Sequence, residues 1–492
     1  MAACETRISV GVEGFEPLVD GGLYERDSYL VRGAPGTGKT TFGLHFLAEG
    51  VDQDEDVLYI NLGEEASTIE RVASNFGFPF NDIDILDLSP SGEDFVEEEG
   101  YDIFSSAEVE RQPITDEIAE AVTDSEPTRV FVDPVTQLRY LTPDDFQFRK
   151  QILSLLRFLS DHGATVLFTS QSTSDEPDDD LQFLSDGVIT LHRDGEQRSI
   201  EVAKLRGSDF VGGEHSMTIS DDGITVYPRL RLRQREHDID TDTPQLSSGI
   251  PELDQMLGGG IEKGTITFIS GPSGVGKSTL GTAFMKEAAG RGERSTLYLF
   301  EESVQTLVHR SKSVNIPIEE MRERGTLEVK PMESLAMDTH QFAAQVKADV
   351  EEHDTDIVMI DGLEGYQLAV HQDDLLQPMH RLVRYLSEQG VTTLLLAETK
   401  QITGAFQVTD HGGTYLADNL VFLQHVELNG EMRKVIGVLK KRMSDYERTL
   451  REFQITEDGV RVGEPMTALR GILTGTPEIV TEGGTAQLID DD

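Results

Sequence analysis

The sequence predicts an α/β protein made of two tandem copies of one domain, each a mostly parallel sheet with helices on both faces. Three observations lead to this fold class. Two segments fit the pattern G-x-x-x-x-G-K-[ST], at Gly33–Thr40 and at Gly271–Ser278. Short β-rich runs such as Val57–Ile60 alternate with helical patterns in both halves, as in α/β domains. Gly33 aligns with Gly271 at an offset of 238 residues, and flanking motifs repeat at similar offsets.

Both glycine-rich segments predict phosphate-binding loops between a strand and a helix. Glycines let backbone N–H groups close around phosphate oxygens, the lysine reaches the β- and γ-phosphates, and the following hydroxyl ligates Mg²⁺. We therefore expect two bound ATP molecules with Mg²⁺. The expected ATP-binding residues are Gly36, Thr37, Gly38, Lys39, Thr40 and Thr41, then Gly274, Val275, Gly276, Lys277, Ser278 and Thr279, with Thr40 and Ser278 as metal ligands.

One aspartate in each copy ends a short apolar run. Asp133 closes the run that starts at Val130, and Asp361 closes the run that starts at Ile357. In nucleotide hydrolases with such loops, a carboxylate at this position helps to hold Mg²⁺. The alternative is an aspartate that caps a turn. We favour the metal role for both aspartates.

A pair of glutamates is expected to end the strand that follows the loop helix in each copy, Glu64 with Glu65 and Glu301 with Glu302. A carboxylate there can polarise a water molecule for in-line attack on the γ-phosphate. Adjacent glutamates are common in so acidic a chain, and surface charge is the alternative interpretation. We favour the catalytic role because the pair recurs at equivalent positions.

Two cations come late in each copy, on hairpins with a β-like pattern. They are Lys204 and Arg206 in the first copy and Lys440 and Arg442 in the second. Such groups can reach the γ-phosphate bound by a neighbouring subunit and stabilise charge in the transition state. The alternative is that they only make the hairpins soluble, since the first role needs a ring of subunits.

The repeat and the composition between its copies predict the domain boundaries. We expect a first domain over residues 1–228, a linker over 229–245, a second domain over 246–475 and an acidic, disordered tail over 476–492. Arg229–Arg235 is basic and could contact nucleic acid, but its alternating pattern better suits an edge strand or a linker.

Composition limits the class of protein. Asp and Glu number 90 against 42 Lys and Arg, a net charge of −48, and there is one cysteine. A disulfide framework and a cysteine-rich metal site are therefore excluded. We see neither a signal peptide nor an apolar run of membrane-spanning length, and expect a cytoplasmic protein without a membrane partner. The acidity is typical of a surface adapted to high salt, as in salt-loving archaea, and mildly disfavours nucleic acid as a partner.

The motifs together resemble the KaiC family, RecA-like P-loop NTPases with two tandem copies of one domain, over about residues 8 to 477. The most particular segments are Ser248–Asp254, Gly258–Gly260, Phe300–Ser303, Val426–Met432, Arg451–Phe453 and Gly471–Pro477. The resemblance implies homohexameric rings with ATP at subunit interfaces. It also implies that the paired glutamates are catalytic and that the four late cations contact ATP from the adjacent subunit.

The family's second domain phosphorylates itself on adjacent Ser and Thr residues, and the matching residues here are Thr414 and Tyr415. Thr414 is the candidate phosphoacceptor that the resemblance implies. The tyrosine hydroxyl sits several Å further from the backbone and would not align with the same γ-phosphate. A two-site phosphorylation cycle is therefore in doubt.

Three functional hypotheses follow. The leading one is a hexameric signalling or timing ATPase with a signalling protein partner and autokinase activity in the second domain. The second is a DNA-acting RecA relative in recombination, repair or unwinding; the loop at 172–180, with five acidic and no basic residues, weighs against it. The third is a switch that binds ATP only to assemble, which the intact glutamates disfavour.

Overall fold

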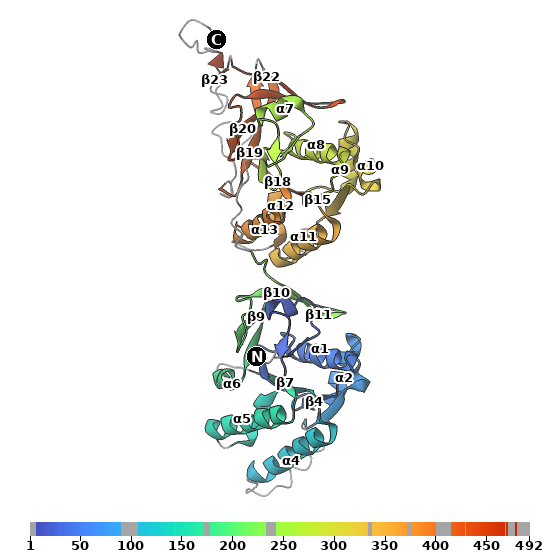
Figure 1. Ribbon diagram of the computed structural model, residues 1–492, viewed down its shortest axis with the longest axis vertical. Helices are drawn as coiled ribbons and strands as arrows, with labels where there is room; N and C mark the ends of the chain where they lie inside the picture. Colours follow the sequence, from blue (N-terminus) through green and yellow to red (C-terminus); the bar gives the residue numbers. More distant parts are fainter. Residues whose placement is uncertain are drawn as a thin grey trace. The chain divides into compact units, whose positions relative to one another are not determined.

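The computed structural model divides into two compact units, Met1–Arg229 and Leu230–Asp492. It describes residues 6–89, 107–142, 144–171, 178–232, 243–332, 337–370, 376–399, 415–428, 430–467, 469–470 and 478–479. Residues 233–242 of the expected linker and most of the expected tail lie outside these ranges, so the domain boundaries stay a prediction. Each unit is a mostly parallel sheet with helices on both faces, which confirms the predicted fold class (Figure 1).

The first unit is built on a nine-stranded sheet of order β11-β10-β9-β8-β3-β7-β6-β4-β5. The strands from β8 to β5 run parallel, and β9, β10 and β11 extend the sheet antiparallel. Their bounds are β3 Ser28–Gly33, β4 Val57–Asn61, β5 Asp84–Asp87, β6 Arg129–Asp133, β7 Thr165–Ser170, β8 Gly187–Asp194, β9 Gln197–Leu205, β10 His215–Ser220 and β11 Gly223–Tyr227; a separate pair is β1 Arg7–Ile8 with β2 Leu23–Tyr24.

Helices cover both faces of this sheet. Helices α1 and α2 pack on one face, and α4 and α5 pack on the other (Figure 1). The helical elements are α1 Lys39–Asp52, α2 Ala66–Asn75, α4 Ala107–Ser125, α5 Asp145–Asp161 and α6 Asp179–Leu184, with 3₁₀ turns η1 Glu16–Leu18, η2 Phe80–Asp82 and η4 Val135–Leu141. The described residues of the basic cluster, 229–232, form no strand, so the edge-strand alternative is not seen there.

The second unit repeats this architecture with a sheet of order β16-β15-β17-β18-β14-β19-β20-β21-β22. The strand bounds are β14 Ile266–Gly271, β15 Ser295–Leu299, β16 Leu327–Pro331, β17 Ile357–Asp361, β18 Thr392–Glu398, β19 Asn419–Leu428, β20 Glu431–Lys441, β21 Arg451–Thr456 and β22 Gly459–Pro465. Short pairs are β12 Gln245–Leu246 with β13 Ile261–Glu262, and β23 Leu469–Arg470 with β24 Glu478–Ile479. Strand β24 lies inside the range expected for the tail, and the rest of that range lies outside the described residues, so disorder of the tail stays a prediction.

The helices of the second unit also lie on both faces of its sheet. Helices α8, α9 and α10 contribute to the apolar cluster on one face, and α11 and α13 to the cluster on the other (Figure 1). Their bounds are α7 Pro251–Met256, α8 Lys277–Gly290, α9 Val304–Lys312, α10 Ile318–Glu323, α11 Thr339–His353, α12 Leu363–Val370 and α13 Leu376–Glu388. In the described part of the chain, every helix is too short or too polar to cross a bilayer.

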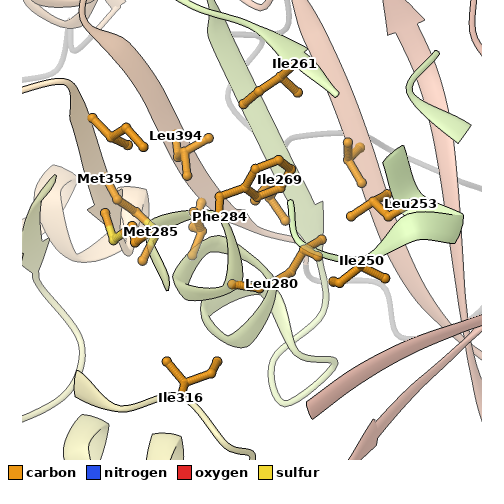
Figure 2. Close-up of a cluster of buried hydrophobic side chains, with 14 of the residues drawn as sticks. Ile250, Leu253, Ile261, Ile269, Leu280, Phe284, Met285, Ile316, Met359 and Leu394 are labelled. Carbon is orange, nitrogen blue, oxygen red and sulfur yellow. The ribbon is translucent and has the colours of Figure 1, made fainter. Parts of the chain in front are cut away.

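The helix after each glycine-rich loop lies unusually close to its sheet. Figure 2 shows Phe284 and Met285 of α8 among the apolar side chains that it shares with the strands. A Cβ atom added at Gly281 would come 2.3 Å from the sulfur of Met359, and one at Gly43 of α1 would come 2.1 Å from the ring of Phe131. Only glycine fits at such a contact. The close packing holds the start of each helix, and with it the loop, at the carboxyl edge of the sheet.

Candidate nucleotide-binding sites

The loop after β3 has the conformation of a phosphate-binding loop. Gly36 and Gly38 have φ of 75° and 107°, in the left-handed region that glycine adopts freely. Lys39 begins α1, and its Nζ donates to the carbonyls of Gly33 and Ala34 at 2.7 and 3.1 Å. The loop thus closes around its own lysine, with the N-terminus of α1 beneath it, where free N–H groups favour an anion.

The loop after β14 has the same conformation. Gly274 and Gly276 have φ of 72° and 117°. The Nζ of Lys277 donates to the carbonyls of Gly271 and Pro272 at 2.8 and 3.1 Å. The predicted loops are therefore both formed, and in each the loop lysine donates to the carbonyls of the first two loop residues.

Burial lowers the pKa of both loop lysines. Desolvation lowers the pKa of Lys39, while Asp133 and Asp178 oppose the shift. Desolvation likewise lowers the pKa of Lys277. The carboxylates that oppose that shift are Glu398, Glu301, Asp361 and Glu364. A buried cation with incomplete compensation is stabilised by the negative charge of a phosphate.

The predicted metal ligands of the first unit meet at the end of parallel strands. The Thr40 hydroxyl donates to Oδ2 of Asp133 at 2.7 Å, and the Tyr59 hydroxyl donates to the same oxygen at 3.4 Å. Thr169 donates to Oδ1. The register explains this meeting, because β6 lies between β4 and β7 and ends level with them.

The equivalent pair in the second unit is Ser278 with Asp361. Burial raises the pKa of Asp361, and the neighbouring Ser278 hydroxyl, Arg310 and Lys277 oppose the shift. Oδ2 of Asp361 is buried and has no hydrogen-bond partner among the described residues. An unpaired buried carboxylate oxygen beside a hydroxyl fits Mg²⁺, which proteins bind through one or two such groups plus substrate phosphates. The described residues contain no cluster of three acidic, His or Cys side chains able to hold a metal by themselves.

The paired glutamates do not end the strands: the first pair begins three residues after β4, and the second begins two residues after β15. In the first unit Asn61 holds the turn, because its Nδ2 donates to the Glu64 carbonyl at 2.5 Å. The side chains of Glu64 and Glu65 are exposed. In the second unit Glu302 is paired with Arg310 at 2.7 Å.

Burial shifts the pKa of both glutamates of the second pair. Burial raises the pKa of Glu301, and Glu364, Asp361 and Glu398 add to the shift. Burial also raises the pKa of Glu302, although Arg310 opposes the shift. A raised carboxyl pKa is typical of a group that can accept a proton near neutral pH.

The two cations late in each unit donate hydrogen bonds to backbone carbonyls, and the arginine of each pair also contacts an aspartate. Lys204 Nζ donates to the carbonyls of Gln182 and Ser185 at 2.7 and 2.5 Å, and Arg206 pairs with Asp186 at 2.9 Å. In the second unit, Lys440 donates to the Ala417 carbonyl at 2.5 Å, and Arg442 pairs with Asp418 at 3.3 Å. The two pairs occupy matching places, at the ends of β9 and β20.

Sequence reasoning missed a further cation on each hairpin. Arg198 donates to the carbonyl of Gly36 at 2.6 Å, and Lys434 donates to the carbonyl of Gly274 at 3.1 Å. Burial lowers the pKa of both side chains. The pair has the offset of 236 residues that relates Lys204 to Lys440, so the repeat could have identified it.

Sequence reasoning also missed carboxylates that only the fold brings to the loops. In the first unit Asp178 is fully buried and paired with Arg32 at 2.7 Å. In the second unit Oε1 of Glu364 accepts from the backbone N–H of Glu398 at 3.0 Å, and its Oε2 is buried with no partner among the described residues. No spacing pattern in the sequence connects these residues to the lysines.

The candidate phosphoacceptor Thr414 lies outside the described residues. Its neighbour Tyr415 is described, and its side chain is exposed. The backbone carbonyl of Tyr415 accepts from Arg442 at 2.9 Å.

Known proteins resemble both units of the chain. The family model described as ATPase, KaiC, matches residues 8–231 and again residues 246–467. A circadian clock oscillator protein KaiC of Parasynechococcus marenigrum is 29% identical over 501 residues, which cover 98% of this chain and 95% of that protein. The protein of the same description in Synechococcus elongatus is 30% identical over 496 residues, 97% of this chain and 93% of the relative.

Proposed function

The chain belongs to the KaiC family of ATPases, and from that premise we propose that both of its units bind and hydrolyse Mg-ATP. One observation carries the proposal. The hydroxyl that follows the loop lysine lies beside the strand-ending aspartate in both units: Thr40 donates to Asp133 at 2.7 Å, and Ser278 is close enough to Asp361 to lower the pKa of that carboxyl. This is the arrangement that a triphosphate with its metal requires.

The residues divide the work as follows. Backbone N–H groups of the loop and the lysine hold the phosphates. Thr40 with Asp133, and Ser278 with Asp361, would hold Mg²⁺, which neutralises charge on the phosphate oxygens when bound. Glu64 with Glu65, and Glu301 with Glu302, orient a water molecule and accept its proton. Arg198 and Lys434 fix the tip of each loop.

The remaining cations act between subunits. We infer a homohexamer in which Lys204, Arg206, Lys440 and Arg442 of one copy reach the ATP of the next. Their present partners are mainly backbone carbonyls, which a phosphate oxygen can replace as acceptor. An unidentified signalling protein is the proposed partner of the assembled ring, and nucleic acid is disfavoured by the net charge of −48.

Phosphate release tests hydrolysis in each unit. The chain is incubated with Mg-ATP in multimolar KCl, beside a Glu64→Gln/Glu65→Gln variant and a Glu301→Gln/Glu302→Gln variant. Each variant is expected to lose the turnover of its own unit while ATP binding persists. Turnover unchanged in both variants would contradict the catalytic role of these glutamates. Absence of phosphate release from the unaltered chain would leave a switch that binds ATP only to assemble.

We also infer serine/threonine autokinase activity of the second unit, with Thr414 as acceptor. Its support is the family membership and the position of Thr414 directly before Tyr415, whose carbonyl Arg442 binds. Intact mass and phosphosite mapping after incubation with Mg-ATP test it. Added phosphate at Thr414 that disappears in Thr414→Val and in Glu302→Gln is the expected result. Phosphate release without added mass would leave a plain ATPase.

A further inference from the structure

An ion pair beside the second nucleotide site joins Glu302 to a cation of helix α9. Nη2 of Arg310 donates to Oε1 of Glu302 at 2.7 Å, and the two side chains are 36% and 20% exposed. The charge of Arg310 also acts on Asp361, the carboxylate that ends β17. The guanidinium group therefore lies near the carboxyl end of β17, where the metal and the γ-phosphate are expected. The proposed function gives this arginine no role.

Helix α9 holds both partners of the ion pair in place. Leu307 and Ser311, on the face of α9 turned to the core, are buried, so the part of the helix that carries Arg310 is packed on both sides of it. The hydroxyl of Ser303 caps the helix by accepting from a backbone N–H of the first turn at 3.2 Å. Glu302 directly precedes this cap. Its backbone is thus fixed by the cap, and its carboxylate is fixed by the arginine.

In the first unit, helix α2, whose residues are all described, provides neither support. Its N-cap is Glu65 itself, and no side-chain hydrogen bond caps the helix. The two buried residues of α2 match those of α9 in spacing, which puts Val72 at the place of Arg310. Val72 packs against the apolar cluster of its own unit instead. The two units therefore differ in how they hold the second glutamate of the pair.

We propose that Arg310 is a positioning residue for the reaction of the second unit, and that it holds the Glu302 carboxylate where this group takes a proton from the attacking water. This inference rests on the proposed hydrolysis of ATP. In that step the water oxygen bonds the γ-phosphorus and the bond from this phosphorus to the bridging oxygen of ADP breaks. The proton of the water passes to Glu302, and Arg310 itself forms and breaks no covalent bond.

The charge of an arginine suits this role. A carboxylate accepts a proton only in its ionised form, and burial raises the pKa of Glu302. Arg310 opposes that shift, so it favours the ionised form and orients it at the same time. A carboxylate that turns away misplaces the attacking water rather than the nucleotide. Loss of the arginine should therefore slow turnover and leave ATP binding unchanged.

Turnover of the second unit, measured apart from ATP binding, tests this role. The full chain carries Glu64→Gln/Glu65→Gln to silence the first unit, and phosphate release is followed with Mg-ATP in multimolar KCl. Arg310→Met is expected to lower kcat about thirtyfold and to leave KM for ATP within about twofold. Arg310→Lys keeps the charge and should lose less. Lys312→Met is the matched control, because it removes an exposed cation from the same turn of α9, and it should leave both constants unchanged.

A double variant separates positioning from direct contact with ATP. Arg310→Met added to Glu302→Gln should cause no further loss, because the arginine acts only through that carboxylate. The residual turnover of Glu302→Gln is measured at high protein concentration so that a further loss can be seen. A further loss in the double variant, or weaker ATP binding in Arg310→Met, would overturn the proposal and indicate that the arginine contacts the nucleotide itself. Full turnover in Arg310→Met would overturn it as well and leave the proposed ATPase activity intact, whereas a second unit that never releases phosphate would contradict both.

Discussion

The two phosphate loops have the same backbone conformation and different electrostatic surroundings. Lys39 has two carboxylates near it, and one of them, Asp178, is already paired with Arg32. Lys277 has four carboxylates near it, and the position of Arg32 is taken by Ser270. The conformation of each loop thus follows from its own sequence. The charges around its lysine come from carboxylates that are distant in the sequence.

The double-glycine turns of the two units also match, but different cations bind their carbonyl groups. The double-glycine turn before each loop leaves two carbonyls for a cation to bind. In the first unit, Arg7 donates to Val19 and Gly22. In the second, Lys441 donates to Leu257 and Gly260, the residues at the same places in the repeat. The cation that binds this turn comes from β1 in the first unit and from β20 in the second.

The largest effect expected from this comparison concerns the loop lysines. Lys277→Ala leaves four carboxylates without their shared cation, and we expect ATP affinity of the second site to fall about a thousandfold. Lys39→Ala leaves Arg32 in place, and we expect about a hundredfold. Both follow from a loss of about 3 to 4 kcal/mol for removing one partner of a buried charge pair. Titration with a fluorescent ATP analogue measures both, and equal losses would show that the surrounding carboxylates do not matter.

Lys441 and Arg7, the cations that bind the double-glycine turns, should contribute different amounts to the free energy of unfolding of their units. The side chains of Lys441 and of its partner Glu262, 3.0 Å away, are 0% and 5% exposed. Lys441→Met leaves a buried carboxylate unpaired, and we expect the free energy of unfolding of the second unit to fall by about 3 kcal/mol.

Calorimetry with separate transitions for the two units checks this expectation. Arg7→Met is the matched variant, and it should cost the first unit about 1 kcal/mol, because Arg7 is only half-buried. Glu262→Gln added to Lys441→Met should restore part of the loss. A larger loss in the Arg7 variant would contradict the comparison.

Acid should weaken the first unit more than the second. His45 is buried, and its Nε2 accepts from the backbone N–H of Ile224 at 2.8 Å. Burial lowers its pKa to about 4. Below pH 6.5 the unfolded chain binds a proton that the folded chain excludes, so stability falls as pH falls towards 4.

We expect about 2 kcal/mol to be lost from this group between pH 7 and pH 5. The second unit has Ala283 at the equivalent place and therefore no loss from this position. Thermal unfolding at both pH values is compared with His45→Gln, which keeps a side-chain acceptor and should remove this part of the pH dependence. An identical pH dependence in that variant would contradict the assignment.

The smallest expected effect concerns the extra carboxylate of the second site. Glu364→Gln removes one negative charge near Lys277 and retains an acceptor for the N–H of Glu398. We expect ATP to bind the second site about fivefold more tightly at low salt, with a smaller gain at high salt. Thr136→Glu adds a carboxylate at the matching place of the first unit and should weaken binding there. Unchanged affinity in both variants would mean that these positions do not influence the phosphates.

Much of each site could be predicted because it depends on short-range sequence. The glycines of both loops, the lysines and hydroxyls, and the aspartates that end β6 and β17 were all identified from spacing and strand pattern, and the structure brings each set together. The roles of the glutamates and of the late cations stay predictions. The phosphoacceptor stays one as well, since Thr414 lies outside the described residues.

The sequence by itself determined the duplicated fold, the two loops and the aspartates that end β6 and β17, because left-handed glycines and strand ends are set within a few residues of the chain. Only the tertiary structure decided which distant groups surround each loop. Glu364 and Glu398 reach Lys277, Asp178 reaches Lys39, and Phe183 and Tyr415 remain exposed beside an arginine. Parallel strands end at one edge of a sheet whatever their order along the chain, so residues more than eighty positions apart become neighbours there.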